Sequence, residues 1–259
     1  MKKSILILAA LLIAFSSSFS QQKKTESAAK PADKPVSSTA EPVTDTMPVE
    51  IKVYHTALLF ADYDVAKNAL FSLISKYPQR LDYLDSLARV YFSMGAYPQS
   101  NAAANIVLAK QPENLQLMEL SAICLNAMKN DKEALALYEK LYGKTNSMYH
   151  LYQIAILQYQ LKRYGECTTS IDILLKSQDA LTQKIQISSD EQNAQEVPLA
   201  AAAHNLRGVM EKDLAQPDKA KADFEAAIKI FPDFTLAKNN LEMMTKPAST
   251  EEKEKAKKK

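Results

Sequence analysis

One pattern of apolar residues recurs about every 34 positions between residues 47 and 245. Pro78 and Pro112 lie 34 residues apart, and each closes a stretch with the same plan. Steps of 33 or 34, and then one longer step, reach three more copies, the last of which ends at Pro232. Within each copy apolar residues recur at spacings of three and four, which is typical of amphipathic helices. The pattern therefore predicts five helix pairs, each joined by a short polar turn.

One column of the repeat alignment contains only small residues. Two helices approach closely only where a small side chain leaves room, so this column marks the predicted crossing point within each pair. The first helices place a small residue opposite the column in four copies, whereas the first copy has Tyr54 there, which indicates an atypical end repeat. The members of the column are Ala66, Ser100, Ala134, Cys167 and Ala220.

The repeats resemble the tetratricopeptide repeat (TPR) family over about 190 of the 259 residues. The most typical stretches are LARVYFSMGAYPQSN and DKAKADFEAAIKIFPDF. The resemblance implies an all-α solenoid of about five helix-turn-helix hairpins with a C-terminal capping helix. Departures from the family pattern at Ser121, Gln158, Arg207 and Glu211 affect local packing without changing the expected fold. The residues that match the pattern are Leu87, Ala88, Tyr91, Gly95, Tyr97, Ala220, Phe224, Ala227 and Pro232.

The repeats divide the chain into a solenoid with one interruption. Residues 182–200 are an insertion between the fourth and fifth copies of the repeat. Long loops within a compact array are uncommon. Their polar composition predicts a mobile loop after a one-turn extension of the preceding helix, and a partner contact there is a hypothesis. Pro198 suits the first turn of the next helix. The expected repeats are 47–80, 81–114, 115–147, 148–181 and 201–234, followed by a cap at 235–245.

The N-terminus has the pattern of a secretory signal peptide. Lys2 and Lys3 precede an apolar run from Ile5 to Phe15, and small residues lead to a predicted cut near Gln21. The run is too short to span a bilayer, so no transmembrane segment is expected in the mature chain. Residues 1–20 therefore predict that the protein is exported, with the periplasm as the expected location. The alternatives are secretion from the cell and tethering to the membrane by an uncleaved signal.

Two further segments lack apolar periodicity. Residues 21–46 are interpreted as a disordered linker and residues 246–259 as a disordered charged tail, since neither can bury enough surface to offset the entropy of ordering. The formal charge of +2 comes from the signal, and residues 47–245 contain 20 basic against 23 acidic side chains. This balance argues against a nucleic-acid partner.

The sequence contains no motif that would assemble a catalytic or metal-binding site. Four glycines, none of them close together, exclude a Gly-rich phosphate loop. The three histidines show no metal-binding spacing, and Cys124 and Cys167 lie on apolar faces as small core residues. We therefore expect no enzyme activity, no cofactor and no metal.

The candidate binding surface is the concave face that the TPR resemblance implies. The stretch from Thr145 to Leu161 has no charged residue, and its helix has two apolar faces. The second apolar face either packs against neighbouring repeats or lines a groove for an apolar peptide segment or a sugar ring. The Lys/Asn arrangement by which some TPR proteins hold a C-terminal carboxylate is not matched. The predicted groove residues are Asp85, Arg89, Phe92, Glu119, Asn126, Tyr149, Tyr152, Ile156 and Tyr159.

These observations predict a non-enzymatic protein interaction scaffold of the bacterial envelope, with a protein or peptide partner. Two alternatives stay open, namely a subunit of an envelope assembly or secretion complex and a glycan or cell-wall binding module. A complex subunit would co-purify stably with its partners, whereas a glycan binder would melt at a higher temperature with cell-wall fragments. The oligomeric state is left open, because a fold does not specify a partner.

Overall fold

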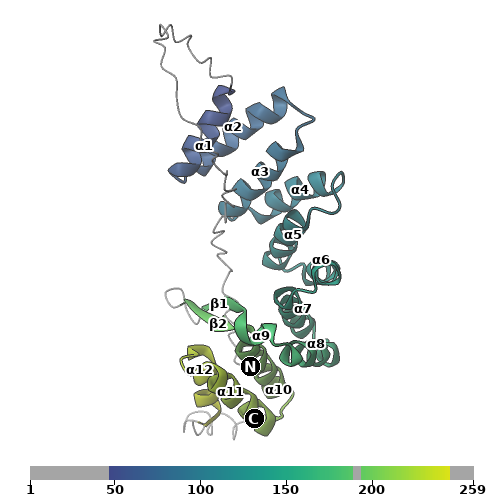
Figure 1. Cartoon of the computed structure of the whole chain (residues 1–259), viewed down its shortest axis with the longest axis vertical. Helices are drawn as coiled ribbons and strands as arrows, with labels where there is room; N and C mark the ends of the chain where they lie inside the picture. Colours follow the sequence, from purple (N-terminus) through teal and green to yellow (C-terminus); the bar gives the residue numbers. More distant parts are fainter. Residues whose placement is uncertain (1–46, 189–193, 246–259) are drawn as a thin grey trace, which may run out of the picture.

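The computed structural model describes residues 47–188 and 194–245. The predicted signal peptide, linker and charged tail lie outside these residues. The described part contains twelve helices and one two-stranded sheet. Its helices stack one after another along an arc, with α1 and α12 at the two ends and α6 and α8 on the outer side (Figure 1). The predicted all-α solenoid is confirmed.

Ten of the helices form the five predicted pairs. The two helices of each pair pack against each other, and the second helix of each of the first four pairs packs against the first helix of the next pair, so packing is continuous along the array. A single-turn helix, α9 (Asp179–Thr182), follows the fourth pair, and α12 (Thr235–Thr245) packs against the fifth. The pairs are α1 (Val49–Leu59) with α2 (Tyr63–Lys76), α3 (Leu81–Ser93) with α4 (Tyr97–Leu108), α5 (Leu115–Ala127) with α6 (Asp131–Thr145), α7 (Met148–Gln160) with α8 (Tyr164–Lys176), and α10 (Leu199–Asp213) with α11 (Pro217–Ile230).

The small column lies at the helix crossings, as predicted. All five of its members are completely buried. The hydroxyl of Ser100 donates a hydrogen bond of 2.8 Å to the carbonyl oxygen of Ala88 across the second pair, so even the polar member is satisfied. In the fifth pair Gly208 lies so close to Phe224 that an added Cβ would be 2.7 Å from the ring. The fifth pair therefore leaves no room at position 208 for a side chain larger than that of glycine.

The turn inside each pair has the same backbone geometry. A residue in the left-handed conformation follows the first helix, and the next amide bonds back to the carbonyl five residues earlier, as in the Schellman motif. In the fourth pair, for example, Lys162 has φ of 60° and the amide of Arg163 donates to the carbonyl oxygen of Gln158 at 2.8 Å. The five left-handed residues are Ala61, Gly95, Lys129, Lys162 and Ala215, so only one turn uses glycine.

The insertion is a β-hairpin, and the prediction of a mobile polar loop was wrong for its described residues. Strand β1 (Lys184–Ser188) pairs antiparallel with β2 (Ala194–Pro198), and Ile185 lies opposite Val197. Both of these side chains are buried in a core that includes Leu199 of α10. Alternation of apolar and polar residues gives the hairpin one face to bury, which the overall polar composition conceals.

The hairpin is also tied to the C-terminal end of the array. The side chain of Gln195 donates to the carbonyl oxygen of Asp233 at 2.6 Å and accepts from the amide of Thr235 at 2.9 Å. Phe234, which immediately precedes α12, and Ala237, in its first turn, are completely buried. The amide of Asn240 donates to Asn205 of α10 at 2.9 Å. No helix among residues 47–188 and 194–245 has the length and apolar character to cross a bilayer.

Candidate binding surface

Polar contacts join the first helices of successive pairs along one side of the arc. These helices, α3, α5, α7 and α10, lie on the inner side in Figure 1. The Arg89 guanidinium is 3.5 Å from the side-chain oxygen of Gln116, and the Tyr159 hydroxyl donates to Asp213 at 2.6 Å. Between them, Glu119 lies 3.8 Å from His150. We call the surface formed by Asp85, Arg89, Gln116, Glu119, Tyr149, Tyr159 and Asp213 the inner face.

The N-terminal half of the inner face carries charged side chains. Arg89 donates to Asp85, one turn earlier on α3, at 2.5 Å. Both side chains are partly exposed, as is Glu119 on α5. Gln116 is exposed between them. The structure therefore brings three of the predicted groove residues onto one accessible surface.

Two further predicted residues lie near the ends of their helices. Phe92 is half-buried and packs edge-to-face against Tyr97 at the start of α4, with 5.9 Å between ring centroids. Asn126 is half-buried in the last turn of α5, and its side-chain oxygen is buried without a hydrogen bond. Phe92 thus contributes to the seam between α3 and α4.

An aromatic cluster lies at the start of α7. The rings of Tyr149 and Tyr138 lie 5.7 and 6.2 Å from that of His150, measured between centroids. His150 is itself buried, and its Nδ1 is 2.9 Å from the hydroxyl of Thr145. Burial, together with the negative charge of Glu119, raises the pKa of Tyr149. Tyr149 is therefore a neutral phenol at the edge of the inner face.

Tyr152 and Ile156 do not line an open groove. They are only 7% and 9% exposed and lie in the same core cluster as residues of α8 and α10. Every residue of α7 from His150 to Gln158 is buried, so both apolar faces of this helix are covered by other parts of the chain. The second apolar face was expected either to pack against neighbouring repeats or to line a groove. Tyr152 and Ile156 pack against neighbouring repeats. Tyr159, which is half-buried, stays at the surface through its bond to Asp213.

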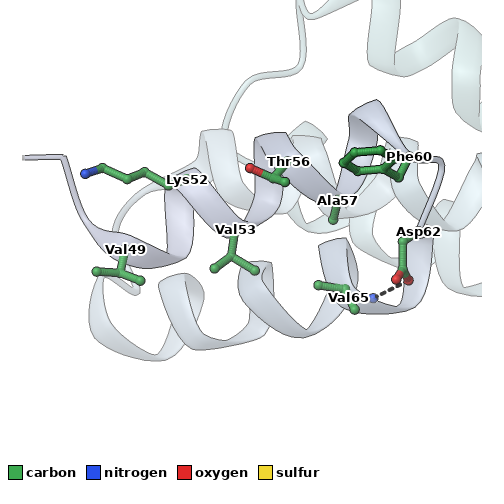
Figure 2. Close-up of a pocket in the computed structure, with 8 residues that line it drawn as sticks. All are labelled: Val49, Lys52, Val53, Thr56, Ala57, Phe60, Asp62 and Val65. Atoms are coloured by element: carbon green, nitrogen blue, oxygen red, sulfur yellow. Dashed lines mark hydrogen bonds between the residues drawn. The ribbon is translucent and has the colours of Figure 1, made fainter.

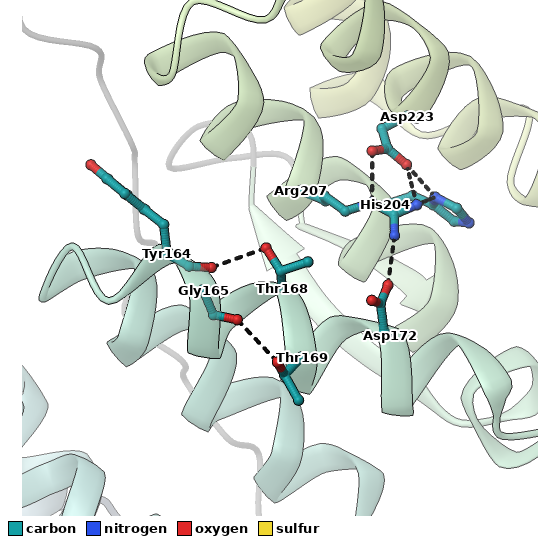
Figure 3. A network of polar contacts seen from close by, with 8 residues as sticks. All are labelled: Tyr164, Gly165, Thr168, Thr169, Asp172, His204, Arg207 and Asp223. Atoms are coloured by element: carbon teal, nitrogen blue, oxygen red, sulfur yellow. Dashed lines mark hydrogen bonds and ion pairs between the residues drawn. The ribbon is translucent and has the colours of Figure 1, made fainter.

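A second polar network connects α8, α10 and α11 (Figure 3). The Arg207 guanidinium makes two parallel hydrogen bonds to Asp223, of 2.7 and 2.8 Å, and a third to Asp172 at 3.0 Å. His204 Nδ1 lies 2.7 Å from the same Asp223 carboxylate. Such bidentate pairs are among the stronger hydrogen bonds in proteins. The network therefore links α8, α10 and α11 through side-chain hydrogen bonds.

The network also shifts the pKa values of its carboxyl groups. Burial opposes ionisation of Asp223, but the hydrogen bonds from His204 and Arg207 prevail and lower its pKa to about 2. Burial, and then the hydrogen bond and negative charge of Asp223, raise the pKa of Glu211 to about 7. A protonated Glu211 can donate to the Asp223 carboxylate, which accounts for a buried Glu211 oxygen that otherwise has no partner.

The sequence analysis did not identify this network. Its one signal was that Arg207 and Glu211 depart from the TPR pattern within the same repeat. Within the described residues no group of three or more His, Cys, Asp or Glu side chains is arranged to hold a metal ion. Cys124 and Cys167 are free and buried, and burial raises the pKa of Cys167 to about 12. They are small core residues, as predicted, and neither is an activated thiol.

Comparisons with known proteins identify the fold. The sequence matches no family profile and no curated protein. The crystal structure of MamA is similar with a TM-score of 0.57 at 9% identity, over 70% of this chain and 90% of that one. YrrB, a TPR protein with an unusual peptide-binding site, is similar with a TM-score of 0.57 at 15% identity, over 73% of this chain and 89% of that one. The chain therefore has the fold of a TPR solenoid.

Proposed function

We propose that this protein is a non-enzymatic scaffold that binds a protein or peptide partner along its inner face. The observation that carries the proposal is the continuous series of polar side chains from α3 to α10. These side chains are spread over several repeats, which suits an extended segment better than a compact small molecule. YrrB, which has a similar fold, is described as having a peptide-binding site, and this supports the proposal.

The charges of the inner face specify the kind of segment. Asp85, Glu119 and Asp213 contribute three carboxylates, against the single guanidinium of Arg89. Complementary charge favours the encounter of partners and selects among them. The partner segment should therefore carry Lys or Arg side chains, and its affinity should fall as the salt concentration rises.

We also propose that the scaffold works in the bacterial envelope after export. The signal pattern in residues 1–20 and the linker composition of residues 21–46 support this location. Fusing residues 1–46 to alkaline phosphatase tests it, because that reporter is active only after export. An inactive fusion, made at a normal level, would contradict export.

Site-specific photo-crosslinking tests the binding surface. A photoreactive residue at Gln116 is exposed on the inner face, and the matched position is Ala136, exposed on α6 at the outer side. We expect a specific crosslinked protein from Gln116 and not from Ala136. Adding Glu119→Lys should remove that product, because it reverses a charge at the centre of the surface. Equal products from both positions, or a product that survives the charge reversal, would contradict binding at the inner face.

A further inference from the structure

The first helix pair exposes an apolar surface at the N-terminal end of the array. A cavity of about 430 Å³ lies between α1 and α2 (Figure 2). Val49, Val53, Phe60 and Val65 are among the residues that line it, and Phe60 is 80% exposed. Large apolar side chains are normally scattered singly on a protein surface, so a group of four around one hollow indicates a contact site. We call this surface the N-terminal face.

The two ends of the array differ in the polarity of the surface that they expose. A solenoid buries its apolar faces by stacking repeats, and its terminal elements need a polar outer side. At the C-terminal end α12 provides a mainly polar one, because Lys238, Asn239 and Glu242 are exposed there beside a single exposed large apolar side chain, Met243. Among the described residues no helix precedes α1 to do the same for the N-terminal face. The polar surface of α12 is a poor match for an apolar surface, so stacking of copies head to tail is disfavoured.

The charged residues of the N-terminal face are placed so that a second copy could pair with them. Lys52 and Asp62 lie at opposite ends of the cavity, with Val53 and Ala57 between them (Figure 2). A two-fold axis through the middle of the face would bring the Lys52 of one copy over the Asp62 of the other, twice. The same rotation would set the exposed Phe60 side chain of each copy against the apolar residues of the other. Opposite charges at the rim and apolar side chains at the centre are the arrangement of a protein interface.

We propose that a second copy of this chain docks on the N-terminal face and forms a two-fold dimer. The dimer covers the apolar surface of both copies, and because contacts in a two-fold interface are reciprocal, it closes without forming a filament. The inner faces lie on other helices and stay accessible. The dimer is therefore bivalent, and it binds a partner that displays two copies of the recognised segment more tightly than a partner with one.

The experiment uses the chain from residue 21 to 259, with its mass in solution measured by light scattering over a range of concentrations. We expect a dimer that dissociates on dilution. Val53→Glu places two like charges near the axis and should give a monomer with an unchanged circular dichroism spectrum. Phe60→Ser is a second variant, since its exposed ring contributes little to the fold. Monomeric wild-type protein, or a dimer that both variants retain, would overturn the proposal.

Disulfide trapping locates the interface independently. Thr56 is exposed on α1 beside the cavity, and the native cysteines are buried, so Thr56→Cys introduces one accessible thiol. Mild oxidation should then link two chains much faster than in the matched variant Ser93→Cys, which is exposed on α3. Equal rates for the two variants would show that copies meet at random or elsewhere, and would overturn the proposed face.

Discussion

Gly208 on α10 and Phe224 on α11 meet so closely that a Cβ on the glycine would lie 2.7 Å from the phenyl ring. Gly208→Ala must therefore displace the ring, which is completely buried. Overpacking of this kind costs about 1–3 kcal/mol, and the better helix propensity of alanine returns about 1 kcal/mol. We expect a net loss of about 1 kcal/mol in the free energy of unfolding, measured by urea denaturation.

The chain offers a matched control for this substitution. Gly143 is also helical, and an added Cβ there meets nothing within 4 Å. Gly143→Ala should stabilise the protein by about 0.5–1 kcal/mol through helix propensity alone. If both substitutions changed the stability in the same direction, the close approach of Gly208 to Phe224 would not govern the packing of the fifth pair.

The left-handed residues in the turns predict a stabilising change. Lys162 is exposed and has φ of 60°, a conformation that costs a side chain about 1–2 kcal/mol relative to glycine. Glycine has more freedom in the unfolded chain, which offsets about 0.4–1 kcal/mol of that gain. Lys162→Gly should therefore raise the free energy of unfolding by about 0.5 kcal/mol, and Gly95→Ala, in the equivalent turn of the second pair, should lower it. Thermal and urea unfolding of both variants measure the effect.

Stability should fall as the pH rises from about 4.5 to 7. The pKa of Glu211 is about 7 in the folded chain against 4.5 ordinarily, so in this range the folded protein holds more protons than the unfolded one. Asp223 acts at lower pH, because its pKa is lowered to about 2 and its contribution is lost on acidification. Glu211→Gln should flatten the curve between pH 4.5 and 7, measured by urea unfolding at several pH values. A slope that persists in the variant would assign this dependence to other groups.

Removing the Arg207 guanidinium should be among the most damaging single changes. Asp223 is buried, and Arg207 supplies two of its hydrogen bonds. Breaking one partner out of a buried ion pair costs about 3–5 kcal/mol, so we expect Arg207→Met to lose about 3 kcal/mol, since His204 still contacts the carboxylate. The double variant with Asp223→Asn should recover part of the loss. A double-mutant cycle by chemical denaturation measures the coupling.

The hairpin should contribute to stability as an ordered element does. Val197 is completely buried, so Val197→Ala removes apolar contact and should cost about 1–2 kcal/mol. Gln186 on the paired strand is exposed, and Gln186→Ala is the control, with an expected change close to zero. The amide of Ile185 should also be protected from hydrogen exchange. Equal and negligible effects of both substitutions would indicate that the segment is unfolded in solution.

The sequence by itself determined the helix pairs and their order. A 34-residue period and a column of small residues describe contacts within a pair and between adjacent pairs, and such contacts recur at constant separation along the chain. The buried positions of Ala66, Ser100, Ala134, Cys167 and Ala220 could therefore be predicted. The same regularity explains why the unreactive cysteines were identified without a structure.

Only the tertiary structure decided the features that depend on particular neighbours. An apolar helix such as α7 needs cover on two sides, but whether another helix or a partner covers Tyr152 and Ile156 depends on how α10 packs. The short alternation of apolar and polar residues around Ile185 and Val197 indicates strands only once the two segments are seen to pair across the insertion. Arg207 meets Asp172 and Asp223 from positions 35 and 16 residues away. Each of these contacts is specific to one repeat, and the period, which is shared by all repeats, carries no information about it.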